Sequence, residues 1–390
     1  MENRFVFNRK IKTVLLSMIA LGVITFLFGI ISKGITDTRF WANLLLNNYY
    51  FLALSLGGAF FVSVHAMGES GWHTSIQRVP EAMSSFIPVA GILMLFTFLF
   101  GMHHLYHWTH TEELDPILEG KSAYLNLPFF YIRFFVYYVV WTALTYYLRK
   151  ASVKMDTDDD IKYFKKQRIL SSVFVVFFAI SSSTSAWDWL MSIDAHWYST
   201  LYGWYIFSGL LVSTMAVIIL ILIFLKNQGY MKHVNKEHMH DLGKYLFAFS
   251  ILWMYLWFSQ YLLQWYGNIP EETVYFYERL NHFNTLFFTN LIMNFVLPFL
   301  ILMARNSKRM DLILGIAAII IFAGHWLDYY LAIMPGIAGE NAHIGFFEIG
   351  ITVGYAGIFL IVVLYMLTKA SLIPVNHPYF KESLEYHTNY

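Results

Sequence analysis

Two aspartates stand at the ends of apolar stretches of this sequence, where a carboxylate is costly and usually functional. Asp188 lies between Trp187 and Trp189, and Asp328 follows 140 residues later, again beside aromatic residues. His325 precedes Asp328 by three residues, so the two side chains share one face of a helix. Because a carboxylate beside an imidazole can accept and pass on a proton, this spacing indicates a proton relay.

Arg133 also lies inside an apolar stretch, where it could pair with either aspartate and hold it ionised. We expect Arg133, Asp188, His325 and Asp328 to form one cluster near the outer face of a membrane, either as a proton relay or beside a quinone. The alternative is that they are interfacial helix-end residues or structural ion pairs.

Hydroxyl and amide side chains form a second set of candidates, because they could line a hydrated path to the acids. The set consists of Ser181, Ser183, Thr184, Gln260 and Gln264. Serine and threonine also bond their own helix or let neighbouring helices pack closely, so packing is the competing interpretation.

The elements that hold these residues are membrane helices. Hydrophobic residues make up 58% of the chain and charged residues only 13%, with a mean hydropathy of +0.52. Runs of about 20 apolar residues, the length that crosses a bilayer as a helix, recur ten times. The predicted spans are Thr13–Ile31, Asn47–Ala66, Ala82–Gly101, Phe129–Leu148, Ile169–Asp188, Ile206–Leu225, Tyr245–Gln264, Leu286–Ala304, Leu312–Leu331 and Phe347–Met366.

Lysine and arginine indicate the orientation, because they gather in cytoplasmic loops. Of the 26 such residues, 21 fall on one side of the predicted spans and four on the other. Both termini are therefore expected in the cytoplasm, and the first apolar run is expected to be an uncleaved span rather than a signal peptide. Within these spans, Asp188 and Asp328 are placed in the outermost turn, with Arg133 about one turn and His325 about two turns from the outer end.

The matched aspartates suggest an internal repeat within a single membrane domain covering 1–390. Spans two to five (46–200) and six to nine (201–335) would form two four-helix bundles, each ending on an aspartate. The first and tenth spans (1–45 and 336–390) would flank them. The fold class is thus an all-α integral membrane protein.

Several classes of site are disfavoured. The chain has no cysteine, so it cannot form disulfides, cysteine-ligated iron–sulfur clusters or covalent c-type haem. No basic stripe suggests nucleic acid. The spacing of His103, His104, His107 and His110 is only a weak metal signal, and we expect no metal site.

The predicted outer loops are acidic, which suits either solvent or a partner with basic patches. These residues are Glu112, Glu113, Asp115, Glu119, Glu271 and Glu272.

Three segments resemble a known family. They are KSAYLNLPFF over 121–130 followed by Arg133, WDWLMS over 187–192 with HWYS over 196–199, and MPG over 334–336. Together they look like the F subunit of alternative complex III, a bacterial quinol:cytochrome c oxidoreductase. The resemblance extends over essentially the whole chain. It implies a polysulfide-reductase-type fold with two four-helix bundles and two extra helices.

The resemblance also implies a setting in the bacterial inner membrane. The partners would be an outer-face iron–sulfur subunit, haem c subunits, a homologous quinol-binding membrane subunit, lipids and, as a further partner, a terminal oxidase. Iron–sulfur clusters and haem c would belong to those partners, and menaquinol to the complex. This subunit would be a scaffold and candidate proton pathway without a redox cofactor of its own.

Two other functions remain open. Ten spans with a suspected repeat and intramembrane polar residues are also typical of a secondary transporter of an ion or small solute. The absence of a strongly charged centre and of obvious broken helices in corresponding halves disfavours it. The other alternative is a purely structural anchor.

Overall fold

Ten helical segments of this chain are long and apolar enough to cross a membrane. The computed structural model describes residues 4–110, 116–158 and 160–387, and within them regular structure is helical throughout. The number of spans predicted from hydropathy is therefore confirmed for the described part of the chain. Glu112, Glu113 and Asp115 of the predicted acidic loops lie outside it.

Most segments are single helices, but the third and eighth are interrupted. The ten are α1 (Arg9–Lys33), α2 (Thr38–Met67), α3 with α4 (Arg78–Ser84, Ile87–Leu105), α6 (Leu127–Met155), α7 (Ile161–Trp189), α8 (Tyr202–Asn227), α9 (Lys236–Gly267), α11 with α12 (Asn284–Leu291, Leu297–Leu302), α13 (Asp311–Ala338) and α14 (Phe346–Thr368). A π-helical turn, Ile292–Val296, joins α11 to α12.

Shorter elements connect the spans. They are α5 (Pro116–Lys121), α10 (Pro270–His282), α15 (Phe380–Leu384) and the 3₁₀ turns η1 (Trp72–Ser75), η2 (His107–Thr109), η3 (Met191–Asp194), η5 (Ser307–Arg309) and η6 (Gly339–Asn341).

Five of the spans begin where an asparagine or aspartate side chain accepts a hydrogen bond from the first turn of the helix. These caps are Asn8, Asp37, Asn126, Asp160 and Asn235. Each satisfies an amide that the helix leaves unpaired. The caps explain why α2 starts nine residues before the predicted Asn47: its first turns are polar, but the Asp37 cap and burial keep them helical.

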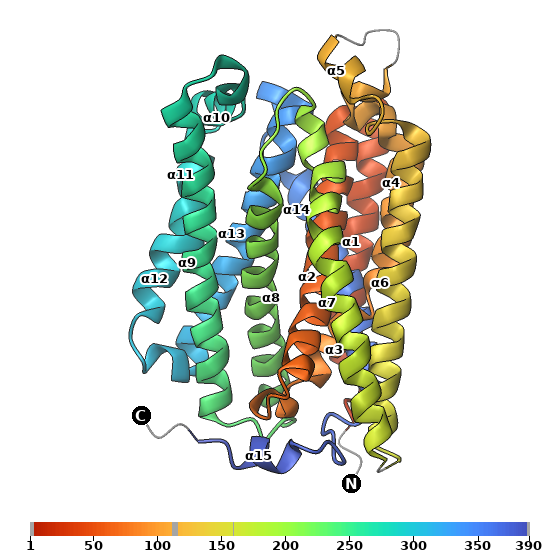
Figure 1. The fold of residues 1–390 in the computed structure, drawn as a ribbon, viewed down its shortest axis with the longest axis vertical. Coiled ribbons are helices and arrows are strands. Elements are labelled where there is room, and N and C mark those ends of the chain that lie inside the picture. Colours follow the sequence, from red (N-terminus) through yellow and green to blue (C-terminus); the bar gives the residue numbers. More distant parts are fainter. Residues whose placement is uncertain (1–3, 111–115, 159, 388–390) are drawn as a thin grey trace.

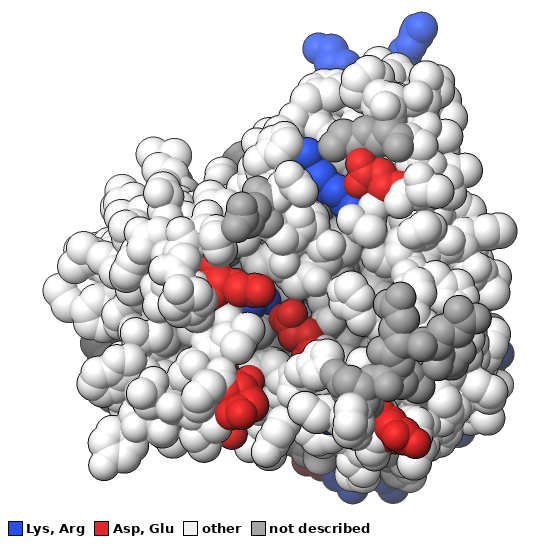
Figure 2. All heavy atoms as spheres, turned by 90° about the horizontal axis from the view of Figure 1, so that it is seen from above, with Lys and Arg blue, Asp and Glu red and all other residues white. Residues whose placement is uncertain are grey.

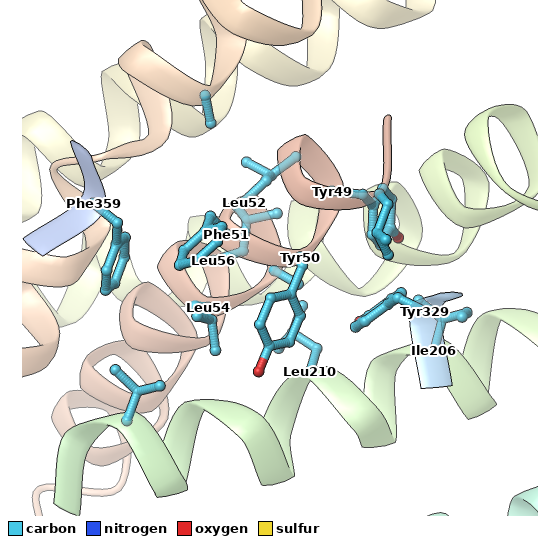
Figure 3. Packing of buried hydrophobic residues seen from close by; sticks show 14 of the residues in the cluster. Tyr49, Tyr50, Phe51, Leu52, Leu54, Leu56, Ile206, Leu210, Tyr329 and Phe359 are labelled. Atoms are coloured by element: carbon cyan, nitrogen blue, oxygen red, sulfur yellow. The ribbon is translucent and has the colours of Figure 1, made fainter. Parts of the chain in front are cut away.

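Helices α2 and α8 form the centre of the molecule. In each, 83% of the most apolar stretch is buried, against 17% in α1. Figure 3 shows how Tyr49, Tyr50 and Phe51 of α2 pack among Ile206 and Leu210 of α8, Tyr329 of α13 and Phe359 of α14. Aromatic rings thus fill much of the space between the central helices.

The other helices surround this pair. Helices α4, α6 and α7 connect in a ring that returns to α2, and α9, α11–α12 and α13 connect in a ring that returns to α8. Helices α1 and α14 pack closely on each other beside α2.

The two ends of the bundle differ. Helices α5 and α10 lie at one end, whereas α15 and the start of α1 lie at the other (Figure 1). We call these the α10 end and the α15 end. The lysine- and arginine-rich connections α6–α7 and α8–α9 lie at the α15 end, so the structure keeps the charge asymmetry of the sequence.

Helix α13 is longer than predicted. It continues through Pro335 to Ala338, so Asp328 lies ten residues, about 15 Å of helix, before its end. The prediction that Asp328 lies in the outermost turn of its helix is therefore wrong. His325 also lies further from the end of the helix than predicted. Asp188 keeps its position, because α7 ends at Trp189.

We expect the contact between α1 and α14 to tolerate no side chain at its closest point. A Cβ atom at Gly22 would lie 2.4 Å from the Gly354 Cα. Gly22→Ala should therefore lower the free energy of unfolding by about 1–3 kcal/mol through overpacking. Thermal unfolding in detergent measures this, with Gly120→Ala as control, where nothing lies within 4 Å of the added atom. Equal stability of the two variants would contradict the close packing.

Candidate functional sites

Asp188 is held in an ion pair. Its Oδ2 accepts hydrogen bonds from Arg133 Nε at 2.8 Å and from the Tyr137 hydroxyl at 3.1 Å. The carboxylate is fully buried at the end of α7, while Arg133 and Tyr137 come from the neighbouring α6. The rings of Tyr124 and Phe129 cover the guanidinium, with centroids 4.0 and 4.2 Å from its Cζ.

This arrangement compensates the negative charge of Asp188. A buried carboxylate is stable when a cation and hydrogen bonds compensate it, and Arg133 supplies both. The expectation that Arg133 pairs with one of the aspartates is met at Asp188. The site supports the structural-ion-pair interpretation more than the relay interpretation.

Asp328 is held differently, by neutral donors from three helices. Trp253 Nε1 of α9 donates to Oδ2 at 2.9 Å, Asn290 Nδ2 of α11 donates to Oδ1 at 2.8 Å, and the Tyr205 hydroxyl of α8 also donates to Oδ1. The residue is 5% exposed. Within the described residues, no arginine or lysine forms an ion pair with it, so its charge is not cancelled by a permanent cation.

His325 is the only basic side chain that the described residues place at ion-pair distance from Asp328. Its Nδ1 lies 3.8 Å from Asp328 Oδ2, as the three-residue spacing predicts. The imidazole is completely buried, and neither ring nitrogen has a hydrogen-bond partner among the described residues. Gly209 of α8 faces this pair, since a Cβ there would lie 3.4 Å from His325 Nδ1.

Amides extend the Asp328 site along the interrupted helix. Asn294 Nδ2 donates to Asn290 Oδ1 at 2.6 Å, and the Asn294 Oδ1 is buried without a partner. Asn294 belongs to the π-helical turn, a distortion that often occurs at functional sites. The π turn thus places an unpaired amide oxygen deeper in the bundle than Asp328.

A narrow cavity adjoins Asp328 on the side of the α10 end. Besides Asp328, its lining includes Gln260, Tyr275, Arg279 and Asn290, and it admits water-sized molecules rather than an aromatic ring. Gln260 contributes a buried oxygen without a partner, which a water molecule could satisfy.

The amphipathic helix α10 closes this cavity. Its Arg279 is 2% exposed, donates to the Leu331 and Tyr275 carbonyls at 2.9 and 2.8 Å, and contacts Asp194 of η3 at 3.3 Å. Burial raises the pKa of Tyr275 to about 12, so its hydroxyl keeps its proton at neutral pH. Asp194, with a 22% exposed side chain, is the titratable group of this set nearest to water.

Of the predicted hydroxyl and amide residues, some contribute to helix packing and one lines the Asp328 cavity. Ser181 accepts a hydrogen bond from Trp141 Nε1 at 2.9 Å, and Thr184 donates to the Ile180 carbonyl at 3.1 Å, as residues in helix packing do. Ser183 of α7 packs against Gly203, where α8 approaches α7 closely. Gln260 alone lines the Asp328 cavity.

Gln264 lies one turn further along α9. With its amide oriented to satisfy both atoms, it accepts from Trp197 Nε1 and donates to the Glu272 carbonyl, each at 3.0 Å. It therefore ties α9 to helix α10 and to the segment that follows η3.

The expected single cluster is therefore two separate sites. Arg133 belongs to Asp188, His325 belongs to Asp328, and the two aspartates share no hydrogen-bond partner among the described residues. Sequence reasoning missed Tyr205, Trp253 and Asn290, because their relation to Asp328 arises from contacts between helices distant in sequence.

Two further buried ion networks were also missed. Arg39 Nη2 lies 2.7 Å from Glu348 Oε1, joining α2 to α14 near the α10 end. Near the α15 end, Arg78 contacts Glu81 at 2.9 Å and Asp156 at 2.7 Å. Burial raises the pKa of Asp156 to about 6, although the Arg78 charge opposes the shift.

Of the four histidines near the end of α4, His103 and His110 contact their own turn, and His104 stacks on Trp41 of α2. His103 Nδ1 lies 3.1 Å from the Thr109 hydroxyl, and His110 Nε2 lies 2.9 Å from the His103 carbonyl oxygen. Within the described residues, no group of three or more histidines and acids could hold a metal ion.

No protein-family model matches the chain, and no curated protein matches it significantly.

Asp188→Asn should destabilise the protein strongly, because it leaves the Arg133 guanidinium buried without a counter-charge. We expect a loss of about 3–5 kcal/mol in the free energy of unfolding, measured by thermal unfolding in detergent. The double variant Arg133→Gln/Asp188→Asn should lose less. As a control, Arg168→Gln removes an exposed pair with Glu69 and should cost about 0–1 kcal/mol. A loss of that small size for Asp188→Asn would refute the buried pair.

A buried histidine at the α15 end should make stability depend on pH. Burial lowers the pKa of His377 from 6.5 to about 4, so between these values the unfolded chain binds more protons than the folded one. Stability is then lost as the pH falls through this window, by about 2 kcal/mol between pH 7 and pH 5 for this residue. The slope of thermal stability against pH should therefore be shallower in His377→Gln, but not in the exposed-site control His387→Gln. Identical slopes in the two variants would contradict a neutral, buried His377.

Proposed function

We propose that this chain is an integral membrane subunit of a quinol-oxidising respiratory complex, in which Asp328 exchanges protons with the α10 end. The proposal joins the resemblance to the F subunit of alternative complex III with the chemistry of the Asp328 site. Electrons would pass through iron–sulfur and haem c subunits. The setting is the bacterial inner membrane, with both termini in the cytoplasm.

One observation carries the proposal: Asp328 is a buried carboxylate held only by neutral donors and a histidine. Such a group must acquire a proton or a nearby positive charge to be stable in a low dielectric. His325, 3.8 Å away, can share that proton. Asp188 lacks this property because Arg133 already neutralises it.

The cavity lies between Asp328 and the α10 end, along the route of the proposed proton exchange. From Asp328 it leads past Gln260 to Arg279, whose partner Asp194 is partly exposed. Water in this space would bridge the carboxylate and the α10 end. The charge asymmetry supports assigning that end to the outer face.

The helix contacts support two four-helix bundles, α2–α7 and α8–α13, flanked by α1 and α14. If they are repeats, α6 corresponds to α11–α12 and α7 corresponds to α13. A neutral amide, Asn290, then partners Asp328 where Arg133 partners Asp188. This replacement of a cation by an amide is the difference on which the proposed proton exchange at Asp328 rests.

The residues around Asp328 do not fit a quinol headgroup, because the cavity is narrower than an aromatic ring. We therefore assign quinol binding to the homologous membrane subunit and a proton-handling and scaffolding role to this chain. Figure 2 shows acidic side chains spread over the α10 end, with basic ones sparse near its middle. Exposed Glu119 and Glu271 suit a redox partner with basic patches.

A secondary transporter is the second candidate, because the interrupted segment α11–α12 lies directly beside Asp328. Broken helices often form ion sites in transporters. The other interrupted segment, α3–α4, is second in its bundle, whereas α11–α12 is third, so the two do not correspond as transporter repeats would.

Asp328→Asn in the intact complex tests the proposal. Loss of a group that transfers a proton should lower quinol-oxidising turnover by about 10²-fold, measured with assembly confirmed by co-purification of haem and iron–sulfur subunits. Asp311→Asn is the matched control, since Asp311 lies on the same helix but at the α15 end, paired with Lys226. It should leave turnover unchanged.

Normal turnover and normal proton release in assembled Asp328→Asn would refute the proton role. If the chain purifies without redox partners and Asp328→Asn abolishes cation-coupled uptake into vesicles, the transporter is correct instead.

A further inference from the structure

An open groove runs between α4 and α6 on the side of the molecule away from Asp328. It has a volume of about 1510 Å³ out to its mouth, and its walls are mainly apolar. Gly91 lets the two helices approach, because a Cβ there would lie 2.7 Å from Tyr138 Cδ1. Side chains on both rims, including Ile92 and Val139, are more than 60% exposed, so the groove faces the lipid.

The groove ends on a guanidinium. Arg149 of α6 lines its end nearest the α15 end, together with Met366 of α14. Its Nη2 donates to the Met366 carbonyl at 2.7 Å, but its Nη1 is shielded from solvent without a hydrogen-bond partner. No carboxylate in the described part of the chain forms an ion pair with Arg149. A cation without a direct ion-pair partner among the described residues thus lies at the end of an apolar groove, with the Glu81 carboxylate as its nearest electrostatic compensation.

The surroundings of Arg149 are those of a lipid headgroup region. It lies six residues before the end of α6, and Tyr146 and Tyr147 beside it are 59% and 47% exposed. Exposed tyrosines favour the level of the headgroups. Ser84 and Ser85, at the break between α3 and α4, add hydroxyl oxygens to the same groove.

We propose that this groove binds a membrane phospholipid with an anionic headgroup, its phosphate on Arg149 and one acyl chain between α4 and α6. A guanidinium forms strong, directional hydrogen bonds to phosphate oxygens, and the Nη1 of Arg149 makes no hydrogen bond to any described residue. Basic pockets between membrane helices on the cytoplasmic side are suited to such lipids. The site is independent of the function proposed for Asp328.

The lipid also satisfies a packing requirement. Helices α4 and α6 are neighbours in the first ring and approach each other at Gly91 and Tyr138, yet an open groove remains between their lipid-facing sides. An acyl chain would fill this space as a side chain fills a core. We therefore expect the bound lipid to join the two helices.

Native mass spectrometry of the full chain in mild detergent tests the site, with phosphatidylglycerol and phosphatidylcholine as the probes. Arg149→Gln should weaken phosphatidylglycerol binding about tenfold and phosphatidylcholine binding less, because both lipids lose the charge-assisted hydrogen bond to their phosphate but only in phosphatidylcholine does a choline cation already offset the phosphate charge. Lys150→Gln is the control, since it removes the same charge one residue away outside the groove. Ala143→Phe, which narrows the groove without touching Arg149, should weaken both lipids.

Phosphatidylglycerol binding to Arg149→Gln at the wild-type level would overturn the proposal, as would an equal loss in Lys150→Gln. Retention of an isoprenoid quinone in the groove in place of phospholipid would also overturn it. If Arg149→Gln fails to fold, Ala143→Phe decides the question: unchanged binding of both lipids refutes the groove as the site.

Discussion

Hydrocarbon offers no partner to a charge or to a backbone amide, and this constraint shapes the whole molecule. The backbone is satisfied within ten helical segments, and buried charges must be compensated by other side chains. Arg39 with Glu348 meets this requirement through a direct pair between helices distant in sequence, and Arg133 with Asp188 meets it through a direct pair between consecutive helices. Such pairs fix how neighbouring helices sit against each other, because a displaced partner would leave a buried charge.

Asp328 does not follow this pattern, because no arginine or lysine among the described residues pairs with it. Its hydrogen bonds come from an indole, an amide and a phenol, none of which carries a charge. The surrounding helices also deviate from regular packing there: α11–α12 contains a π-helical turn, and Gly209 leaves space at the imidazole. A narrow cavity then connects the carboxylate with the α10 end. The same fold thus contains one acid paired with an arginine and one acid held by neutral donors beside a histidine.

The sequence predicted the elements better than the sites. Apolar runs give the number of spans because each span must be apolar over its full length. Helix ends were less accurate, since Asn43 and Asn47 are buried inside α2 and Pro335 lies within α13, where local composition favours a loop. The His325–Asp328 contact was predictable because both residues lie on one helix.

Contacts across helices were not predictable in this way. Nothing in the local sequence links Trp253 or Asn290 to Asp328, and nothing selects Asp188 over Asp328 as the partner of Arg133. Those choices depend on helix rotation and depth, which arise from packing of the complete bundle. Asp188 and Asp328 therefore looked alike in the sequence and differ in the structure.

Infrared difference spectroscopy of the intact complex, between its oxidised and quinol-reduced states, tests the central claim most directly. The account predicts a carboxylic acid carbonyl band that changes with reduction, disappears in Asp328→Asn and persists in an assembled Arg133→Gln/Asp188→Asn variant. A band that persists in Asp328→Asn and disappears in that double variant would show that the mobile proton belongs to Asp188 and would contradict the account.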